Sequence, residues 1–335
     1  MGNAAKWAHN AVKVRITWPL LALGLLYLFN LIVIPGFFRM EIIDGHLYGN
    51  LIDVINRGTP LMIMSIGMTL VIAKGGIDIS VGSVLAIAGA MAISMLESHG
   101  LWVALFSSLG VGLLCGLWNG MLVACLGIQP MVATLILLTV GRGIAQLITN
   151  GKVLTTSHEA YEFIGKGYLF GLPFAMYIAA AVFVMVVLLK TKTAFGMFLE
   201  SLGSNRTASE YAGVRPKQIF MLAYALCGLL AAVAGIIYSS NFSSADANNA
   251  GLWYELDAIL AVVIGGTSMR GGRFYLGGTV VGAIFIQSLT TTIYSLGIAP
   301  ESILLVKAIV VIIVSLIQSP ALRHWFAGKE REVAF

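Results

Sequence analysis

The chain has 335 residues, of which 59% are hydrophobic and only 10% are charged. Its mean hydropathy is +0.92. Soluble globular proteins carry about 25% charged residues, so this composition excludes that class and indicates an all-α integral membrane protein in a lipid bilayer. The net charge of +5 does not indicate a nucleic-acid partner, because the basic residues lie between apolar runs.

The apolar runs predict about ten transmembrane helices. The first is longer than a signal-peptide core of about 7–15 residues, and no small-residue cleavage site follows it, so we interpret it as a membrane span. The run 257–268 is too short to cross about 30 Å of hydrocarbon, so it is either broken or continued by its flanks. In chain order the runs are 16–38, 56–73, 80–96, 101–126, 130–149, 173–190, 217–238, 257–268, 274–294 and 301–318.

The basic residues predict that both termini are cytoplasmic. With this topology, only four of the 20 Lys and Arg residues lie on the outer side, namely Arg39, Arg57, Lys152 and Lys166, as the positive-inside rule expects. Spans 2–5 then begin outside and spans 7–10 begin inside, which is the arrangement of an inverted repeat. We expect one transmembrane domain, 1–335, with cytoplasmic segments 1–15, 191–216 and 319–335.

The loop from Lys190 to Lys217 gathers basic residues in a chain that is otherwise mostly hydrocarbon. Within it, the segment Leu199–Ala212 has the pattern of a short amphipathic helix, with Ala208, Tyr211 and Ala212 on one side. A folded element on the basic side of a membrane protein is typical of a docking site. We therefore predict that this loop binds a cytoplasmic partner.

The segment Gly75–Ser83 interrupts the apolar pattern after the second span. Asp78 followed by Ser80 is typical of a helix N-terminus, where such side chains cap free N–H groups and favour the positive end of the helix dipole. Two interpretations are open. The segment is either an ordinary capped turn or a turn at the cytoplasmic mouth of a transport pathway.

A second glycine-rich segment, Gly265–Arg273, has the composition of a phosphate-binding loop. However, it has no Gly-Lys-Ser/Thr ending and no strand before it, so it is not a P-loop. Arg270 places it on the inner side. We interpret its glycines as the means of tight helix packing and a sharp turn.

The outer segment Ser239–Asp257 combines carboxylates, amides and aromatic rings. These groups bind sugars, because they pair with hydroxyl groups and offer a ring face to the apolar side of a sugar. The alternative, which the sequence favours, is a polar loop with interfacial Trp and Tyr. The candidate residues are Asn248, Asn249, Trp253, Glu255 and Asp257.

Ionisable residues inside spans are candidates for a transport pathway. Arg142 and Lys307 lie in the outer halves of their spans. Asn119 and Gln146 are uncharged polar residues that also lie within spans. Snorkelling and interhelical hydrogen bonds are the alternative roles. No Ser/His/Asp set, HExxH motif or nucleotide-binding motif occurs, so we expect no enzyme activity and no metal site. Active transport would take its energy from a partner or an ion gradient.

Three segments carry a resemblance to a known family: GMTLVIAKGGIDISVGS (67–83), GMFLESLGSNRTASEYAGV (196–214) and ELDAILAVVIGGTSMRGGRF (255–274). With them, about residues 16–318 resemble the permease subunits of sugar-importing ABC transporters, the ribose/galactose class. Within that class, the sequence looks closest to the galactofuranose-type permease subunit.

The resemblance implies an assembly in the bacterial inner membrane. Two permease subunits, identical or different, form the pathway, and two cytoplasmic ATP-binding subunits bind ATP and Mg and drive it. This chain itself then binds no cofactor. A periplasmic binding protein delivers a small sugar, a galactofuranose-like or other pentose or hexose, and import proceeds by alternating access.

The resemblance also implies a coupling helix, which rests in a groove of the ATP-binding subunit. It maps onto Leu199, Gly203, Arg206, Ala208, Glu210, Tyr211 and Gly213. Ser209 stands where the family has the second alanine of a pair, which leaves the details of that contact open.

Two other functions compete with this one. An ion-coupled secondary sugar transporter needs a cation-coordinating cluster near the bilayer midplane, but Arg142 and Lys307 are both cationic. A purely structural membrane scaffold does not need the patterned cytoplasmic helix.

Overall fold

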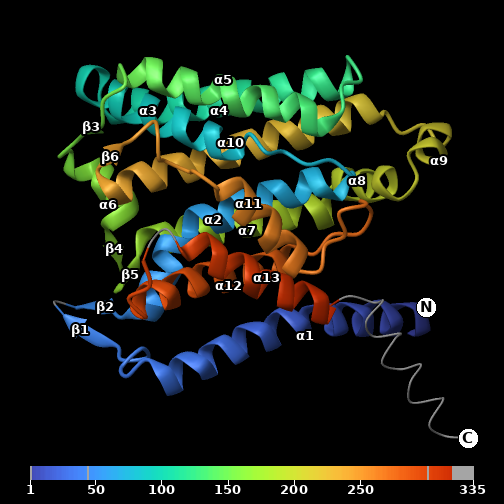
Figure 1. The fold of residues 1–335 in the computed structure, drawn as a ribbon. Helices are drawn as coiled ribbons and strands as arrows, with labels where there is room; N and C mark the ends of the chain where they lie inside the picture. The colour runs from blue at the N-terminus through green and yellow to red at the C-terminus, as the bar shows by residue number, and fades with distance from the viewer. Residues whose placement is uncertain (1, 44, 300–301, 319–335) are drawn as a thin grey trace, which may run out of the picture.

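In a computed structural model, which describes residues 2–43, 45–299 and 302–318, long helices run side by side and short elements gather at their two ends (Figure 1). The long helices are α1 (Gly2–Val33), α2 (Asn50–Ala73), α3 (Val81–His99), α4 (Leu101–Ala124), α5 (Pro130–Thr149), α7 (Phe174–Lys192), α10 (Pro216–Phe242) and α12 (Leu276–Ser295).

These eight are the described helices that are long and apolar enough to cross a membrane. The other two predicted spans correspond to shorter helices, α11 (Tyr254–Ile264) and α13 (Ile303–Gln318). The mostly helical, membrane-spanning fold class is therefore confirmed. The count of ten spans, the inverted repeat and the side on which the termini lie remain predictions.

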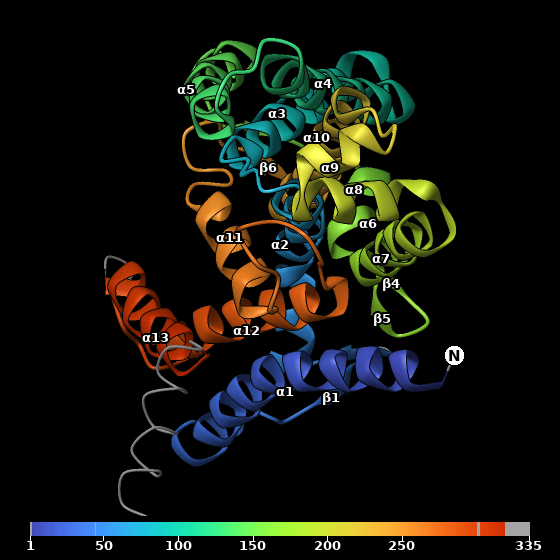
Figure 2. The same ribbon diagram turned by 90° about the vertical axis from the view of Figure 1, so that its right-hand side faces the viewer.

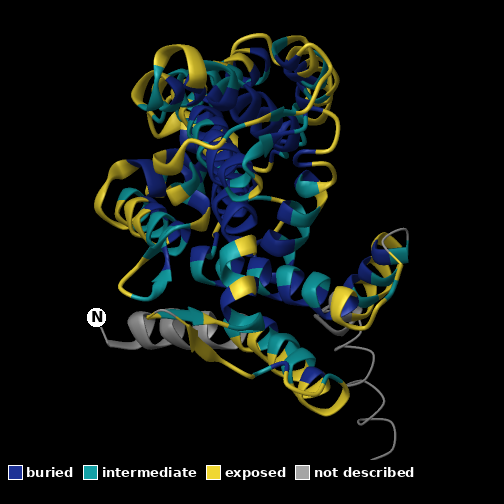
Figure 3. Ribbon diagram, turned by 90° about the vertical axis from the view of Figure 1, so that its left-hand side faces the viewer, coloured by how far each residue is buried: buried dark blue, intermediate teal, exposed yellow. Residues whose placement is uncertain are grey.

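Helix α2 forms the centre of the bundle together with α3 and α10. The α2 side chains are buried along most of the helix, including Ile63, Met68 and Ile72. Figure 3 shows that buried residues gather in the middle of the helical body. Helices α4 and α10 approach closely because small residues line their contact. A Cβ atom added at Gly116 would lie 2.3 Å from the Tyr224 carbonyl oxygen. Such small-residue contacts replace the hydrophobic driving force that helices lack in lipid.

Helix α1 lies to one side of the main body, as Figure 2 shows. It packs against α12, where the Asn30 side chain donates to the Thr292 hydroxyl at 2.8 Å and Tyr27 is 3.1 Å from the Ser288 hydroxyl. Much of the rest of α1 between residues 16 and 33 is exposed and apolar. Exposed apolar side chains on a membrane helix are the surface that lipid covers.

One end of the bundle carries short antiparallel ladders and the helix α6 (Glu159–Lys166) (Figure 1). The ladders pair β1 (Glu41–Ile43) with β2 (His46–Tyr48), β3 (Leu154–Thr155) with β6 (Ser244–Ala245), and β4 (Tyr168–Leu169) with β5 (Leu172–Pro173). The opposite end carries α8 (Ala194–Ser204) and α9 (Arg206–Tyr211).

The predicted single helix over Leu199–Ala212 is wrong, because the chain breaks into α8 and α9 at Asn205. The Asn205 backbone is extended, with φ −155° and ψ 101°, and its side-chain oxygen accepts a hydrogen bond from the Ala208 N–H at 3.0 Å. An asparagine side chain at this position caps a new helix and so stabilises the break.

The outer loop predicted over Ser239–Asp257 is shorter than expected. Helix α10 continues to Phe242, and α11 already begins at Tyr254. The run 257–268 was expected to be either broken or continued by its flanks. Helix α11 takes in three preceding residues, starting at Tyr254, but ends at Ile264 and has only 11 residues, so it remains a short helix. Between these helices, residues 246–253 form a connection that we call the re-entrant turn.

Candidate functional site

The re-entrant turn runs back into the bundle along α3. Ala245 packs beside Ile93 and Leu96 near the C-terminal end of α3. Six residues later, the Gly251 carbonyl lies against Gly82, the second residue of α3, where an added Cβ would be 2.5 Å from it. Backbone that is not helical is tolerated at membrane depth only inside protein or beside a water-filled cavity.

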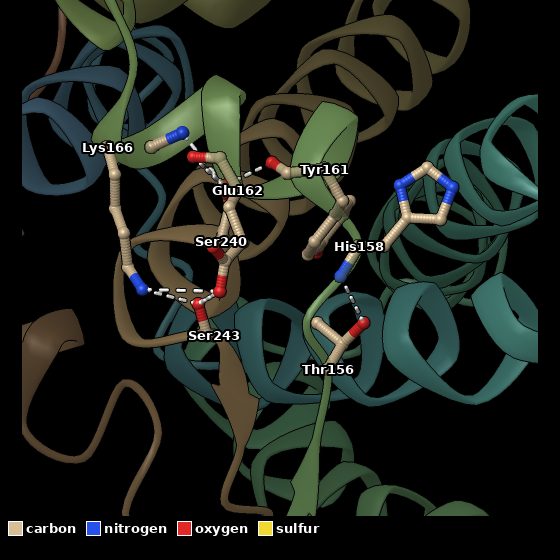
Figure 4. Close-up of polar contacts among 8 residues, drawn as sticks. Thr156, His158, Tyr161, Glu162, Lys166, Ser240 and Ser243 are labelled. Carbon is tan, nitrogen blue, oxygen red and sulfur yellow. Dashed lines mark hydrogen bonds and ion pairs between the residues drawn. The ribbon is translucent and has the colours of Figure 1, made fainter.

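Helix α6 is bonded to the end of α10, a few residues before this turn begins (Figure 4). The Ser240 hydroxyl donates to the Tyr161 carbonyl at 2.6 Å and accepts from the Gly165 N–H at 2.8 Å. Ser243 bonds to the Glu162 carboxylate, and Lys166 donates to the Ser243 hydroxyl at 2.5 Å. The hydrogen bond from Ser243 lowers the pKa of Glu162.

Arg142 of α5 holds the middle of the turn. Its guanidinium donates to the carbonyls of Ala247 at 3.3 Å and Ala250 at 2.5 Å. Beside it, Gln146 donates to the Asn248 side-chain oxygen at 2.7 Å. The structure thus brings together three of the predicted pathway residues. A half-buried guanidinium that binds two carbonyls fixes the position of the turn.

Two buried polar atoms near this turn have no hydrogen-bond partner within the described residues: one terminal nitrogen of Arg142 and Oε2 of Glu255. The Glu255 carboxylate lies under the turn, close to Gly82. Buried polar atoms are normally paired with protein or water. These two atoms therefore mark a polar spot inside an apolar bundle.

The surface of the turn is polar and exposed. Asn248, Asn249 and Trp253 are all exposed. Asp246 accepts from the Asn249 side chain at 2.7 Å, which orders that amide. Trp253 has a φ of +67°, a conformation that is unusual for a bulky side chain and occurs most often at functional sites.

Asp257 and Lys307 do not join the turn's hydrogen bonds. They form an ion pair of 2.7 Å that links α11 to α13. Because both side chains are mostly buried, loss of either would leave an unpaired charge.

Asp78, Ser80 and Asn119 form one buried network on the other side of Gly82. The Asp78 carboxylate accepts from the Ser80 hydroxyl at 2.6 Å and from its N–H at 3.0 Å, while Asn119 donates to the Ser80 hydroxyl at 2.8 Å. Ser80 is the N-cap residue of α3, but its side chain makes no capping bond. The predicted capping is therefore wrong for the Ser80 side chain, whereas the Asp78 carboxylate does accept from a free backbone N–H before α3, that of Ser80.

At the α9 end, three backbone segments meet without intervening side chains. We call this contact the glycine junction; it consists of Ala73, Gly203, Gly271 and Gly272. The Gly272 N–H donates to the Ala73 carbonyl at 2.8 Å, and a Cβ at Gly203 would lie 1.9 Å from that same oxygen. Tight packing by the glycines of 265–273, predicted from the sequence, is confirmed here.

Helix α9 projects from this junction. Of the predicted coupling residues, Leu199 is fully buried and Gly203 is in the junction, whereas Ala208 and Glu210 are exposed and Tyr211 is 90% exposed. Arg206 and Glu210 pair with each other at 2.9 Å along α9. Gly213 follows with φ +87°, a left-handed conformation that favours glycine.

In the sequence, Lys74 counted only as one of the basic residues on the inner side of the membrane. The structure places its side chain in a buried, aromatic environment. It is 8% exposed and its ammonium lies 4.0 Å from the Tyr224 ring centre and 4.5 Å from that of Phe220. Burial lowers its pKa to about 7. The two rings stand four residues apart on α10, so they lie on one face of that helix. This pair of aromatic residues was the signal in the sequence for a site that could enclose a cation.

Comparison with known proteins gives consistent results. The galactofuranose transporter permease protein YtfT of Escherichia coli (strain K12) is 51% identical over 313 residues, 92% of each chain. The fructose import permease protein FruF of Bifidobacterium longum (strain NCC 2705) is 39% identical, covering 96% of this chain and 92% of the relative. The ribose import permease protein RbsC of Escherichia coli (strain K12) is 36% identical, covering 85% and 88%. No solved structure matches this chain.

The spans, their polar re-entrant turn and these relatives define a multi-pass permease of the bacterial inner membrane. The family model described as "Branched-chain amino acid transport system / permease component" matches residues 50–315, and the chain belongs to that family. The resemblance to permease subunits of sugar-importing ABC transporters is thereby confirmed.

Proposed function

We propose that this chain is a permease subunit of an ATP-driven importer of a monosaccharide. The observation that carries this proposal is the re-entrant turn, which presents exposed amides and Trp253 beside Arg142 and Gln146. Amides form hydrogen bonds with sugar hydroxyls, and an indole ring packs on the apolar face of a sugar. The named substrates of its relatives are galactofuranose, fructose and ribose.

In this proposal, α9 docks on an ATP-binding subunit that supplies the energy. Exposed Tyr211 and Ala208 form the contact, and Arg206 and Glu210 set its polar rim. Aromatic side chains commonly dominate such contacts. A second permease subunit completes the pathway, and a periplasmic binding protein delivers the sugar to the turn.

The glycine junction supports a route by which ATP would drive alternating access. A movement of α9 is transmitted through Gly203 to Ala73 and Gly272, because backbone atoms in direct contact leave no soft side chain to absorb it. Ala73 ends α2, and the next turn leads to Asp78 and α3. The far end of the re-entrant turn lies against the start of α3. Rotation of α2 and α3 would therefore move the turn.

The experiment that tests this function is uptake by the complete transporter in proteoliposomes. Galactofuranose, fructose and ribose are compared with a branched-chain amino acid, with the binding protein outside and ATP inside. We expect uptake of one of the sugars only when ATP is present. Uptake that persists without ATP and follows an imposed H⁺ or Na⁺ gradient would instead establish the secondary-transporter alternative.

A further inference from the structure

A hollow of about 470 Å³ opens beside α9 and is separate from the re-entrant turn. It lies between the end of α2, the α4–α5 connection at residues 125–129, and the first turns of α9 and α10. We call it the basic hollow. The lining residues that the argument uses are Lys74, Leu126, Gln129, Arg206, Lys217 and Phe220.

The basic hollow is built for a negative charge. Lys74, Arg206 and Lys217 line it, and none of its lining residues is acidic. Arg206 is partly neutralised by Glu210 on the same helix, but Lys217 is exposed and makes no ion pair within the described part of the chain. Such a concentration of one sign attracts a ligand of the other.

Lys74 supplies the strongest indication. Its ammonium has three donors, yet it makes no hydrogen bond or ion pair to any described residue. It lies over the rings of Phe220 and Tyr224, and the Asp78 carboxylate attracts it only from beyond ion-pair distance. Buried charges are normally paired. An anion in the basic hollow would supply the missing acceptor and would oppose the burial that lowers the pKa of Lys74.

The N-terminus of α5 adds to this field. Gln129, its N-cap residue, and Pro130, its first residue, both line the basic hollow. Helix α5 is 20 residues long, so its N-terminal end carries the positive pole of a full helix dipole, which favours phosphate groups.

The basic hollow also has an apolar side that continues onto the lipid-facing surface. Leu126 lines it and is exposed, and Met131 and Val132 follow it as exposed residues of α5. A ligand with a phosphate group and a hydrocarbon chain would fill both parts. A small soluble phosphate would contact only the basic part.

We propose that the basic hollow binds the phosphate group of an anionic phospholipid from the membrane leaflet on the α9 side. Basic pockets between transmembrane helices are suited to such headgroups. The bound phosphate would link Lys74 of α2 to Lys217 of α10 and Arg206 of α9. It would thereby stabilise the position of the helix that we assign to coupling, and it does not depend on the identity of the transported sugar.

The test measures lipid binding to the purified full-length chain in neutral detergent by native mass spectrometry. The probes are dioleoylphosphatidylglycerol, the zwitterionic dioleoylphosphatidylcholine, and soluble glycerol phosphate. Lys217→Gln and Lys74→Gln are compared with the unchanged protein. Lys192→Gln is the matched control, because Lys192 is an exposed lysine at the end of α7 that does not line the basic hollow.

We expect phosphatidylglycerol to bind more tightly than phosphatidylcholine. Lys217→Gln should weaken its binding about fivefold, the effect of about 1 kcal/mol for one basic residue near a membrane surface, and Lys74→Gln should weaken it more. Lys192→Gln should leave it unchanged. If Lys74→Gln does not fold, the exposed Lys217 still decides the outcome.

Equal phosphatidylglycerol binding by the unchanged protein and Lys217→Gln would overturn the proposal. The proposal would also be overturned if Lys192→Gln weakened phosphatidylglycerol binding as much as Lys217→Gln does. The loss would then come from the general surface charge and not from the basic hollow. A third outcome is that glycerol phosphate binds, that Lys217→Gln weakens this binding, and that no lipid binds selectively. The ligand would then be a soluble phosphate, and the lipid proposal would be overturned.

Discussion

The glycine junction and the re-entrant turn hold non-helical backbone in place by different means. In the junction, Ala73, Gly203 and Gly272 touch backbone to backbone. The turn is instead held by side chains, chiefly the Arg142 guanidinium on two carbonyls and the Gln146 amide on Asn248. Direct backbone contact is stiff, whereas a turn held by long side chains has alternative arrangements.

This difference suits the functions that we propose for the two regions. A stiff junction transmits the displacement of α9 without loss. A turn held by side chains rearranges as a substrate arrives and leaves, while its exposed amides remain available for hydrogen bonds. Substitutions in the two regions should therefore fail in different ways, and the following experiments are ordered from the largest expected effect to the smallest.

The largest effect is expected for Gly203→Ala. The added Cβ would lie 1.9 Å from the Ala73 carbonyl oxygen, so α8 or α2 must shift. Overpacking costs about 1–3 kcal/mol, and contact with backbone places this site at the upper end. We expect a clearly lower melting temperature of the purified protein in detergent, together with loss of uptake.

Gly277→Ala is the matched control for this experiment. Gly277 lies in α12, not far along the chain from the junction, and a Cβ there meets no atom within 4 Å. It should leave the melting temperature and uptake unchanged. A Gly203→Ala protein as stable and active as Gly277→Ala would contradict the stiff junction.

Arg142→Met should impair transport more than it impairs folding. It removes the charged hydrogen bonds that hold Ala247 and Ala250, each worth about 1.5–3 kcal/mol, so we expect uptake to fall about tenfold or more. Uptake kinetics of the complete transporter measure this effect, with the melting temperature as the check on folding.

Gln146→Leu, which removes one exposed bond to Asn248, should lower uptake less than Arg142→Met does. Full uptake by Arg142→Met would show that the turn does not depend on this residue.

Tyr211→Ala should weaken association with the ATP-binding subunit while the permease itself stays folded. The side chain is 90% exposed, so its removal costs the isolated protein little. A central aromatic residue of an interface contributes about 2 kcal/mol or more. Co-purification of the two subunits measures the loss.

The control for Tyr211→Ala is Phe170→Ala. Phe170 is an equally exposed aromatic residue, 92% accessible, in the turn between β4 and β5 at the other end of the bundle. Its removal should leave co-purification unchanged. If both substitutions act alike, exposed aromatic area in general is responsible, and α9 is not the specific contact.

The smallest effect on stability is expected for Glu210→Lys. The Arg206–Glu210 ion pair is exposed, and such pairs contribute about 0.3–0.5 kcal/mol. The melting temperature should hardly change. Association with the ATP-binding subunit should nevertheless weaken, because the charge reversal alters the rim of the proposed contact. Unaltered association would remove Glu210 from the interface.

The sequence alone predicted most of the helices, because membrane spans are long apolar runs that owe little to distant residues. It also located the break at α11, which is too short to cross the bilayer. It did not locate the break at Asn205. There, the hydrophobic pattern favours one continuous helix, whereas the Asn205 side chain favours a break by capping a new helix. Local propensity does not decide between a continuous and a broken helix.

The candidate residues were selected by type, but their grouping came from the fold. Arg142 and Gln146 stand four residues apart on α5, but Asn248 joins them only because residues 246–253 turn back along α3. Asp78, Ser80 and Asn119 were separate candidates that proved to be one buried network. The spacing of Phe220 and Tyr224 on α10 can be read from the sequence, but only the fold shows that these two rings enclose Lys74.

The sequence by itself determined that this protein spans the membrane, to which family it belongs and which loop is basic. Those properties depend on composition and local pattern. Only the tertiary structure decided that the re-entrant turn reaches the start of α3, that Gly203 touches Ala73, and that Lys74 faces a hollow whose lining residues include no acidic one. These features depend on contacts between residues more than 100 positions apart, whose packing no local pattern specifies.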